Sequence, residues 1–170
     1  GESFDYGPWR FLPHFDPGFT AAYFDQTGRY AYGRQADACM WAMCRLADCF
    51  IAFCDKQTLE AQLHDFYPKM ETGLAAGLAR RLGVVPANDI KSGQELCRQF
   101  FDAARASQAG FDQLLHDFWG GRQRRGDYPA DAIAGFANCL SGFAPAGNAD
   151  HAFFTSKTAL SMTIDEVEAI

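Results

Sequence analysis

Apolar side chains recur at steps of three and four residues through residues 36–140, and glycine or proline interrupts the pattern at intervals. This spacing puts apolar groups on one face of a 3.6-residue turn and therefore predicts amphipathic helices. The predicted helices span 36–53, 57–82, 92–107, 111–119 and 129–140. A chain with this pattern is mainly α, and its 170 residues are the length of one domain.

Residues 1–34 lack the helical period and intersperse proline and glycine with aromatic residues. We expect an extended, turn-rich stretch there, with a short strand pair near Gln26–Gly28. Its aromatic side chains are expected to pack on the helices that follow, and the alternative is a docking surface for a protein substrate. The predicted organisation is therefore a single domain with a stretch over 1–34 and a helical lobe over 35–170.

Three of the predicted helices carry sequence features that predict their burial or the residues at which they begin and end. The helix over 36–53 has polar residues only within a stripe of about 80°, so we expect it to be buried at the centre of the lobe. Pro68 should kink or split the helix over 57–82, and Gly83 should end it. The sequence Ser92-Gly-Gln-Glu95 fits a capping box and predicts that the next helix begins at Ser92.

Charge and hydropathy exclude two classes of partner. The net charge of −6 argues against a broad nucleic-acid surface. No apolar run reaches the roughly 18 residues that a membrane-spanning helix needs. We therefore expect neither nucleic acid nor a membrane as a partner.

The chain contains six cysteines, and the first four are spaced by five residues. Five residues turn a helix by about 500°, so successive cysteines lie about 140° apart and do not converge on one ion. Zinc sites instead use cysteines two to four residues apart. We expect buried, small apolar side chains, with redox control as the alternative. The cysteines are Cys39, Cys44, Cys49, Cys54, Cys97 and Cys139.

The other chemically active side chains are scattered. The four histidines are expected at the surface or its boundary, even where an aspartate follows, because adjacent helical residues do not face each other. Asp16 and Asp25 are expected to form turns, with a supporting charge near a metal as the alternative. The arginines of the loop 120–127 are expected in solvent, with phosphate binding as the alternative. These histidines and arginines are His14, His64, His116, His151, Arg122, Arg124 and Arg125.

A possible metal ligand stands near the start of the chain, in the sequence Asp5-Tyr6-Gly7-Pro8. Glycine tolerates backbone angles that other residues avoid, and proline fixes the next φ, so a turn here can hold the Asp5 carboxylate outward. Mg²⁺ favours carboxylate oxygen and often takes only one or two such ligands from the protein. A plain turn without a metal is the alternative interpretation.

Aromatic, acidic and glycine residues continue this turn in an order that resembles the SelO/YdiU family, a group with a protein-kinase-like fold. The segments that carry the resemblance are Phe4–Pro13, Phe15–Pro17, Tyr23–Asp25 and Gly28–Gln35, followed by Trp41 and Leu46-Ala47. The resemblance is close over about residues 3–55, and it implies the helical C-terminal lobe of a kinase-like fold. Residues 1–34 would then correspond to the metal-binding turn and an activation segment.

The resemblance also implies a function. The family is regarded as transferring AMP from ATP to hydroxyl side chains of proteins, with Mg²⁺ or Mn²⁺ as cofactor. Asp5 would bind the metal, and Tyr6 and Gly7 would shape its turn. The nucleotide-binding lobe and the catalytic loop would lie upstream, so we expect no catalytic residue in this chain and no activity from it alone. The expected location is the bacterial-type cytoplasm, or the mitochondrion in a eukaryote.

Two further points follow from the comparison with the family. Some members place a cysteine after the Asp-Tyr-Gly turn, but residues 19–23 contain none, which argues against that redox control. Arg10, Arg29 and Arg34 are candidate partners for phosphate or backbone groups, without an assigned role. The alternative function, from a different class, is a non-catalytic helical module that binds or regulates.

Overall fold

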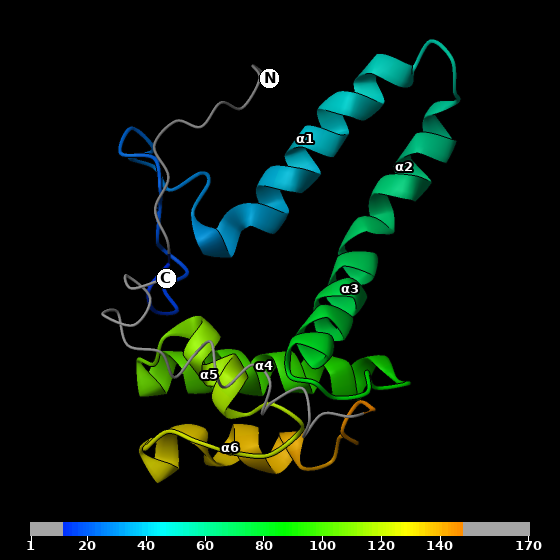
Figure 1. The fold of residues 1–170 in the computed structure, drawn as a ribbon. Helices are drawn as coiled ribbons and strands as arrows, with labels where there is room; N and C mark the ends of the chain where they lie inside the picture. Colours follow the sequence, from blue (N-terminus) through cyan, green and yellow to red (C-terminus); the bar gives the residue numbers. More distant parts are fainter. Residues whose placement is uncertain (1–11, 148–170) are drawn as a thin grey trace, which may run out of the picture. The chain divides into compact units, whose positions relative to one another are not determined.

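The fold is described from a computed structural model, which describes residues 12–147 of the chain. Within this range the chain is helical and contains no strand, which confirms the mainly α fold class (Figure 1). An isolated β-bridge joins Val84 to Pro145. The elements are η1 (Tyr32–Arg34), α1 (Gln35–Phe50), α2 (Lys56–His64), α3 (Phe66–Arg81), α4 (Ile90–Ser107), α5 (Phe111–Asp117) and α6 (Ala130–Leu140).

The chain divides into two compact units, and the boundary falls between Gly73 and Leu74, inside α3. The division at residues 34 and 35 that we predicted from composition stays a prediction. Among the helices within 12–147, none combines the length and the apolar character that crossing a membrane requires.

Residues 12–31 form turns and no strand. The predicted strand pair near Gln26–Gly28 is wrong, because Asp25 and Gly28 instead close consecutive turns through backbone hydrogen bonds. The predicted packing of the aromatic residues holds only in part. The ring of Phe15 meets that of Tyr32 edge to face at 6.1 Å, whereas Tyr23 and Phe24 are 85% and 64% exposed.

Helix α1 forms where the sequence predicts it and ends three residues early, at Phe50. The prediction that it is buried is wrong, because none of its residues is buried. It contacts α2 and η1, and these two elements cover too little of its surface. Large apolar side chains on it therefore remain accessible, with Trp41 51% and Leu46 58% exposed.

The helix predicted over 57–82 is split into two helices, α2 and α3, which is one of the two outcomes expected from Pro68. Helix α2 begins after Asp55, whose carboxylate accepts hydrogen bonds from the backbone N–H and the hydroxyl of Thr58. It ends at His64, and α3 begins two residues later. Pro68 then lies in the first turn of α3, where a missing N–H leaves no helical hydrogen bond broken. In Figure 1, α1 and α2 run in opposite directions on either side of their connection.

The second unit is organised around the packing of α4 against α6 (Figure 1). The ring of Phe136 lies 5.5 Å from that of Phe100 and 4.9 Å from that of Phe118, so three phenylalanines form the centre of the core. The predicted stripe of α4 is confirmed, since Leu96, Phe100 and Ala104 are fully buried. Burial of a phenylalanine or leucine side chain contributes about 1.5–3 kcal/mol each.

The start of α4 differs from the prediction. Asp89, and not Ser92, is the N-cap, and its carboxylate accepts a hydrogen bond from the backbone N–H of Ser92 at 2.8 Å. The helix therefore begins at Ile90, two residues before the predicted start. This capping bond lowers the pKa of Asp89 below its ordinary value. The predicted end at Ser107 is confirmed.

Gly83 ends α3 as predicted, with a positive φ of +63°. Its N–H donates to the carbonyl of Arg80, and the next N–H, of Val84, donates to that of Ala79. A Cβ at position 83 would lie within 2.6–2.9 Å of the Trp119 ring, so both the backbone angle and the close approach of this ring require glycine.

A buried carboxylate, Asp117, lies at the end of α5 and is 1% exposed. Its Oδ2 accepts a hydrogen bond from the hydroxyl of Tyr128 at 2.6 Å, and its Oδ1 accepts one from Nε2 of Gln113 at 2.7 Å. The backbone carbonyl of Asp117 accepts from the N–H of Arg124 at 2.7 Å. These bonds tie the loop after α5 to the core, because each satisfies a group that is shielded from water.

The prediction that the histidines lie at the surface is wrong for His116, which is 8% exposed. Its Nδ1 lies 3.4 Å from Oδ1 of Asp117, although the two residues are adjacent in α5. Their side chains are long enough to turn toward each other where the helix ends. His14 and His64 are exposed as predicted, and His151 lies outside the described residues.

Replacing Tyr128 by phenylalanine should destabilise the chain, because the buried carboxylate of Asp117 would lose one of its donors. A hydrogen bond to a charged group contributes about 1.5–3 kcal/mol, and a loss of this size is expected in urea unfolding. Tyr67→Phe is the matched control, since its hydroxyl donates to the exposed Asp37 at 3.0 Å and should matter much less. Equal losses in the two variants would contradict the assignment.

The same tyrosine predicts a pH dependence. Burial, together with the hydrogen bond to Asp117, raises the pKa of Tyr128 above its ordinary value near 10. The unfolded chain therefore ionises this group first, and the stability it supplies below about pH 10 is lost as the pH rises further. Between about pH 8 and about pH 11, the wild type should lose more unfolding free energy than Tyr128→Phe. Parallel losses would show that Tyr128 does not titrate in this way.

Candidate functional site

The predicted metal turn lies outside the described residues. Asp5, Tyr6, Gly7 and Arg10 all precede residue 12, so the metal assignment stays a prediction. Within residues 12–147, no three His, Cys, Asp or Glu side chains gather in a way that could hold a metal ion. A candidate site within the described residues therefore consists of residues other than the predicted metal ligand.

The cysteines do not take the buried positions that we predicted. Cys39 and Cys49 are exposed, and the other four are half-buried. Three of the six lie on α1, which has no buried residue. In the second unit, burial raises the pKa of the Cys97 thiol to about 11. A thiol with so high a pKa is protonated near neutral pH and is a poor nucleophile or metal ligand.

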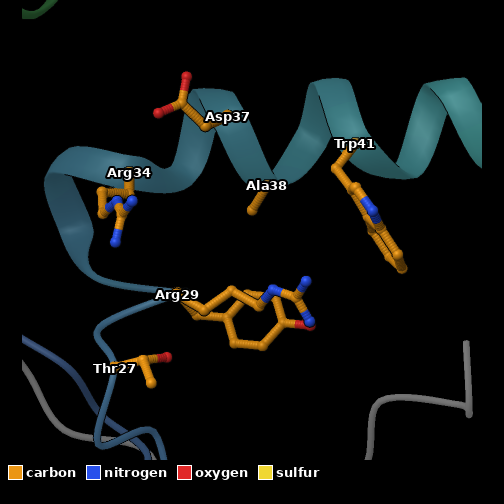
Figure 2. A pocket seen from close by; sticks show the side chains of 7 residues that line it. Thr27, Arg29, Arg34, Asp37, Ala38 and Trp41 are labelled. Carbon is orange, nitrogen blue, oxygen red and sulfur yellow. The ribbon is translucent and has the colours of Figure 1, made fainter.

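A pocket of about 300 Å³ lies between α1 and the turns that precede it (Figure 2). It brings together two arginines, one acid and two aromatic rings from within 15 residues of sequence. The side chains that line it are Thr27, Arg29, Tyr30, Arg34, Asp37, Ala38 and Trp41.

The turn on one side of the pocket depends on the carboxylate of Asp25. Its oxygens accept hydrogen bonds from the backbone N–H groups of Arg29 at 2.9 Å and Tyr30 at 2.7 Å. The hydroxyl of Thr27 also donates to it, at 3.4 Å. The bond from Tyr30 is the main reason that the pKa of Asp25 lies below its ordinary value. Asp25 therefore acts as the turn residue we predicted, and so does Asp16, which accepts from the N–H of Gly18.

Arg29 crosses the pocket toward α1. Its guanidinium carbon lies 5.1 Å from the centre of the Trp41 ring, a distance at which a cation is attracted to an aromatic face. Figure 2 shows the side chain of Arg29 extended toward Trp41. The contact orients the guanidinium without neutralising its charge.

Arg34 and Asp37 complete the charges of the pocket. Among residues 12–147, no carboxylate lies within 4.0 Å of the guanidinium nitrogens of Arg29 or Arg34. Figure 2 shows the carboxylate of Asp37 pointing away from Ala38 and Arg29, and this carboxylate instead accepts a hydrogen bond from the hydroxyl of Tyr67 at 3.0 Å. The residues that line the pocket thus carry two cations and one anion, and Asp25 on the adjoining turn adds a second carboxylate, whose pKa Arg29 helps to lower.

Both carboxylates that line a second pocket, in the other unit, already stabilise the fold. This pocket has a volume of about 610 Å³ and lies beside the start of α4 and the end of α6. Asp89 in its wall caps α4, and the guanidinium of Arg98 donates to Glu95 and holds its pKa near 2. These two carboxylates therefore have structural roles.

The basic loop after α5 is also structural in part. Nε of Arg124 donates to the carbonyl of Trp119 at 2.5 Å, which holds the loop closed, whereas Arg122 and Arg125 are exposed as predicted. Sequence reasoning singled out Arg29 and Arg34 without a role and missed Asp37 and Tyr30 as their neighbours. The available signal was that Arg34, Ala38 and Trp41 follow one another at helical spacing, directly after an Asp-x-x-Gly turn.

Replacing Asp25 by alanine should open the turn and release Arg29 from Trp41. Amide hydrogen exchange at Arg29 and Tyr30 should accelerate, because both N–H groups lose their acceptor. In the wild type, the same protection should be present above about pH 4 and should fade as the pH drops through the lowered pKa. Asp16→Ala is the control, since it frees the N–H of Gly18 instead. Unchanged exchange at Arg29 and Tyr30 in Asp25→Ala would contradict this account of the turn.

Comparison with known proteins connects the pocket and the undescribed turn to one family. A relative from Trichormus variabilis, named protein nucleotidyltransferase YdiU, is 35% identical over 117 residues, which cover 69% of this chain and 24% of that protein. A relative of the same name from Azotobacter vinelandii is 30% identical over 132 residues, covering 78% of this chain and 25% of that protein. One from Synechocystis is 44% identical over 85 residues, covering 49% and 18%.

The chain therefore spans about a quarter of the length of the first of these curated relatives. The sequence profile of the family described as "Protein adenylyltransferase SelO" matches residues 1–133, which include both the Asp5-Tyr6-Gly7 turn and every residue of the pocket. The match covers more than half of the chain, and the chain belongs to the SelO family.

Proposed function

We propose that this chain is part of a protein adenylyltransferase, which transfers AMP from ATP to hydroxyl side chains of proteins. The observation that carries the proposal is the Asp5-Tyr6-Gly7-Pro8 sequence inside the region that matches the SelO family. The relatives are named protein nucleotidyltransferases, a name that implies a nucleoside triphosphate as donor. Because the chain spans about a quarter of such a relative, the activity is proposed for the intact protein.

Asp5 is the proposed metal ligand. A carboxylate is a hard oxygen ligand of the kind that Mg²⁺ and Mn²⁺ prefer, and glycine two residues later permits the tight turn that would expose it. Tyr6 and Gly7 would shape this turn. A divalent ion bound there would offset the negative charge of the ATP phosphates and of the leaving pyrophosphate.

The described residues would serve this reaction as a scaffold. We propose that the helices belong to the C-terminal lobe of a kinase-like fold, in agreement with the absence of strands from residues 12–147. The segment over 12–34 would then follow the metal turn, where it would help to position the protein substrate. The exposed Tyr23, Phe24 and Tyr30 suit such a role, since aromatic side chains are enriched in binding surfaces.

Labelling with ATP that carries a radioactive α-phosphate tests the proposal on the intact protein. The wild type should label protein acceptors in the presence of Mg²⁺ or Mn²⁺, and Asp5→Asn should reduce the labelling by at least about a hundredfold, because the amide is a much weaker metal ligand. ATP labelled on the γ-phosphate should give no labelled protein, which distinguishes transfer of AMP from transfer of phosphate.

Asp131→Asn is the matched control, because it also removes one carboxylate, from the exposed first turn of α6. Its labelling should equal that of the wild type. Equal labelling by Asp5→Asn would remove this residue from the mechanism. An absence of α-phosphate label in every variant would support the other class of function, a non-catalytic binding or regulatory module.

A further inference from the structure

We propose that the pocket of Arg29, Arg34 and Trp41 binds an acidic side chain, aspartate or glutamate, of the protein substrate and so positions the peptide that carries the accepting hydroxyl. This inference rests on the proposed function for its substrate, and it adds a chemical preference that the transfer of AMP does not require. Arg29 and Arg34 are positioning residues in this account.

The charge of the pocket favours a carboxylate. Two guanidinium groups face it and one carboxylate, that of Asp37, lies at its edge and points away (Figure 2). Asp37 at the edge and Asp25, which attracts Arg29, offset part of the two positive charges, so a carboxylate with one negative charge is matched better than a phosphate group with nearly two. Guanidinium groups also present paired N–H donors that match the geometry of a carboxylate.

The surroundings of the pocket favour a peptide over a small anion. Trp41 is 51% exposed and Tyr30 is 56% exposed, so both rings offer apolar surface at the pocket itself. Tyr23 and Phe24, whose rings lie 5.3 Å apart, are also exposed on the segment that precedes the pocket residues in sequence. Tryptophan, tyrosine and arginine are the residues that most often dominate the energy of protein interfaces. A free anion would leave these rings unused.

The pocket is also organised before any ligand arrives. Asp25 holds the backbone of Arg29 and Tyr30 through two short hydrogen bonds, and the Trp41 ring orients the guanidinium of Arg29. A binding group that is already ordered loses less conformational entropy on binding than a mobile one. Its volume of about 300 Å³ accommodates one side chain and part of its backbone, and it is too small for a folded domain.

The test uses the intact protein and synthetic peptides that contain one accepting hydroxyl. The four peptides are identical except at a few positions near the hydroxyl, and each peptide carries one residue type there: glutamate, glutamine, lysine or phosphoserine. Inorganic phosphate is used as a free competitor. Two quantities are measured for each peptide: kcat/KM for transfer of α-labelled AMP, and binding by fluorescence anisotropy without ATP. The wild type should prefer the glutamate peptide over the glutamine peptide by about tenfold in both.

Arg34→Gln and Arg29→Gln should each reduce this preference to below about threefold, and the double variant should abolish it. Arg45→Gln is the matched control, because Arg45 also lies on α1 but pairs with Asp48 at 3.1 Å and does not line the pocket. Its preference should equal that of the wild type. Ala38→Glu gives an independent variant, since a carboxylate placed in the pocket should reverse the preference in favour of the lysine peptide.

Each outcome decides the inference separately from the proposed function. Peptide labelling that shows no glutamate preference, or that keeps the preference in the double variant, overturns the inference and leaves the transferase intact. A phosphoserine preference above that for glutamate, or complete competition by millimolar inorganic phosphate, also overturns it, in favour of a phosphate site. Selective binding of the glutamate peptide with no AMP transfer to any peptide supports the pocket and contradicts the transferase.

Discussion

The hydrogen bonds that Asp25 accepts from the backbone of Arg29 and Tyr30 are the interaction on which the pocket depends. They close the turn before η1, and the closed turn brings Arg29 within 5.1 Å of the Trp41 ring on α1. An exposed carboxylate makes such bonds at little desolvation cost, because water still reaches its outer face. A short polar turn thus brings two arginines to one pocket on a chain whose net charge is −6.

The two units are stabilised in different ways. In the second unit, Phe100, Phe118 and Phe136 form a dry core, and the buried Asp117 ties the following loop to it. In the first unit, α1 buries none of its residues, and its turns depend on polar caps such as Asp25 and Asp55. The unit that supplies the pocket therefore has the smaller apolar contribution to its stability, and its turns depend more on polar hydrogen bonds.

The helices could be predicted because their signals are local. The apolar period predicted α1, α4 and α6. Gly83 predicted the end of α3, and Pro68 predicted the break between α2 and α3. The burial of α1 could not be predicted in the same way. Its narrow polar stripe shows that most of the helix surface is apolar, but it does not show which other part of the chain covers that surface. The buried pair of His116 and Asp117 was missed because side-chain reach, and not backbone direction, brings the two groups to 3.4 Å. The helical spacing of Arg34, Ala38 and Trp41 was a local signal for one wall of the pocket, but the contact of Arg29 with Trp41 joins a turn to a helix and has no such signal.

The central claim is that an acidic residue of a protein substrate occupies this pocket, and photo-cross-linking in the intact protein tests it most directly. A small diazirine amino acid at position 38, whose side chain lines the pocket, would be irradiated with the glutamate peptide, and the adduct would be mapped by mass spectrometry. Adducts within about one or two residues of a glutamate are expected, since one residue spans at most about 3.6 Å, and none from the exposed position 42. Adducts spread evenly along the peptide, or equal yields from both positions, would contradict the claim.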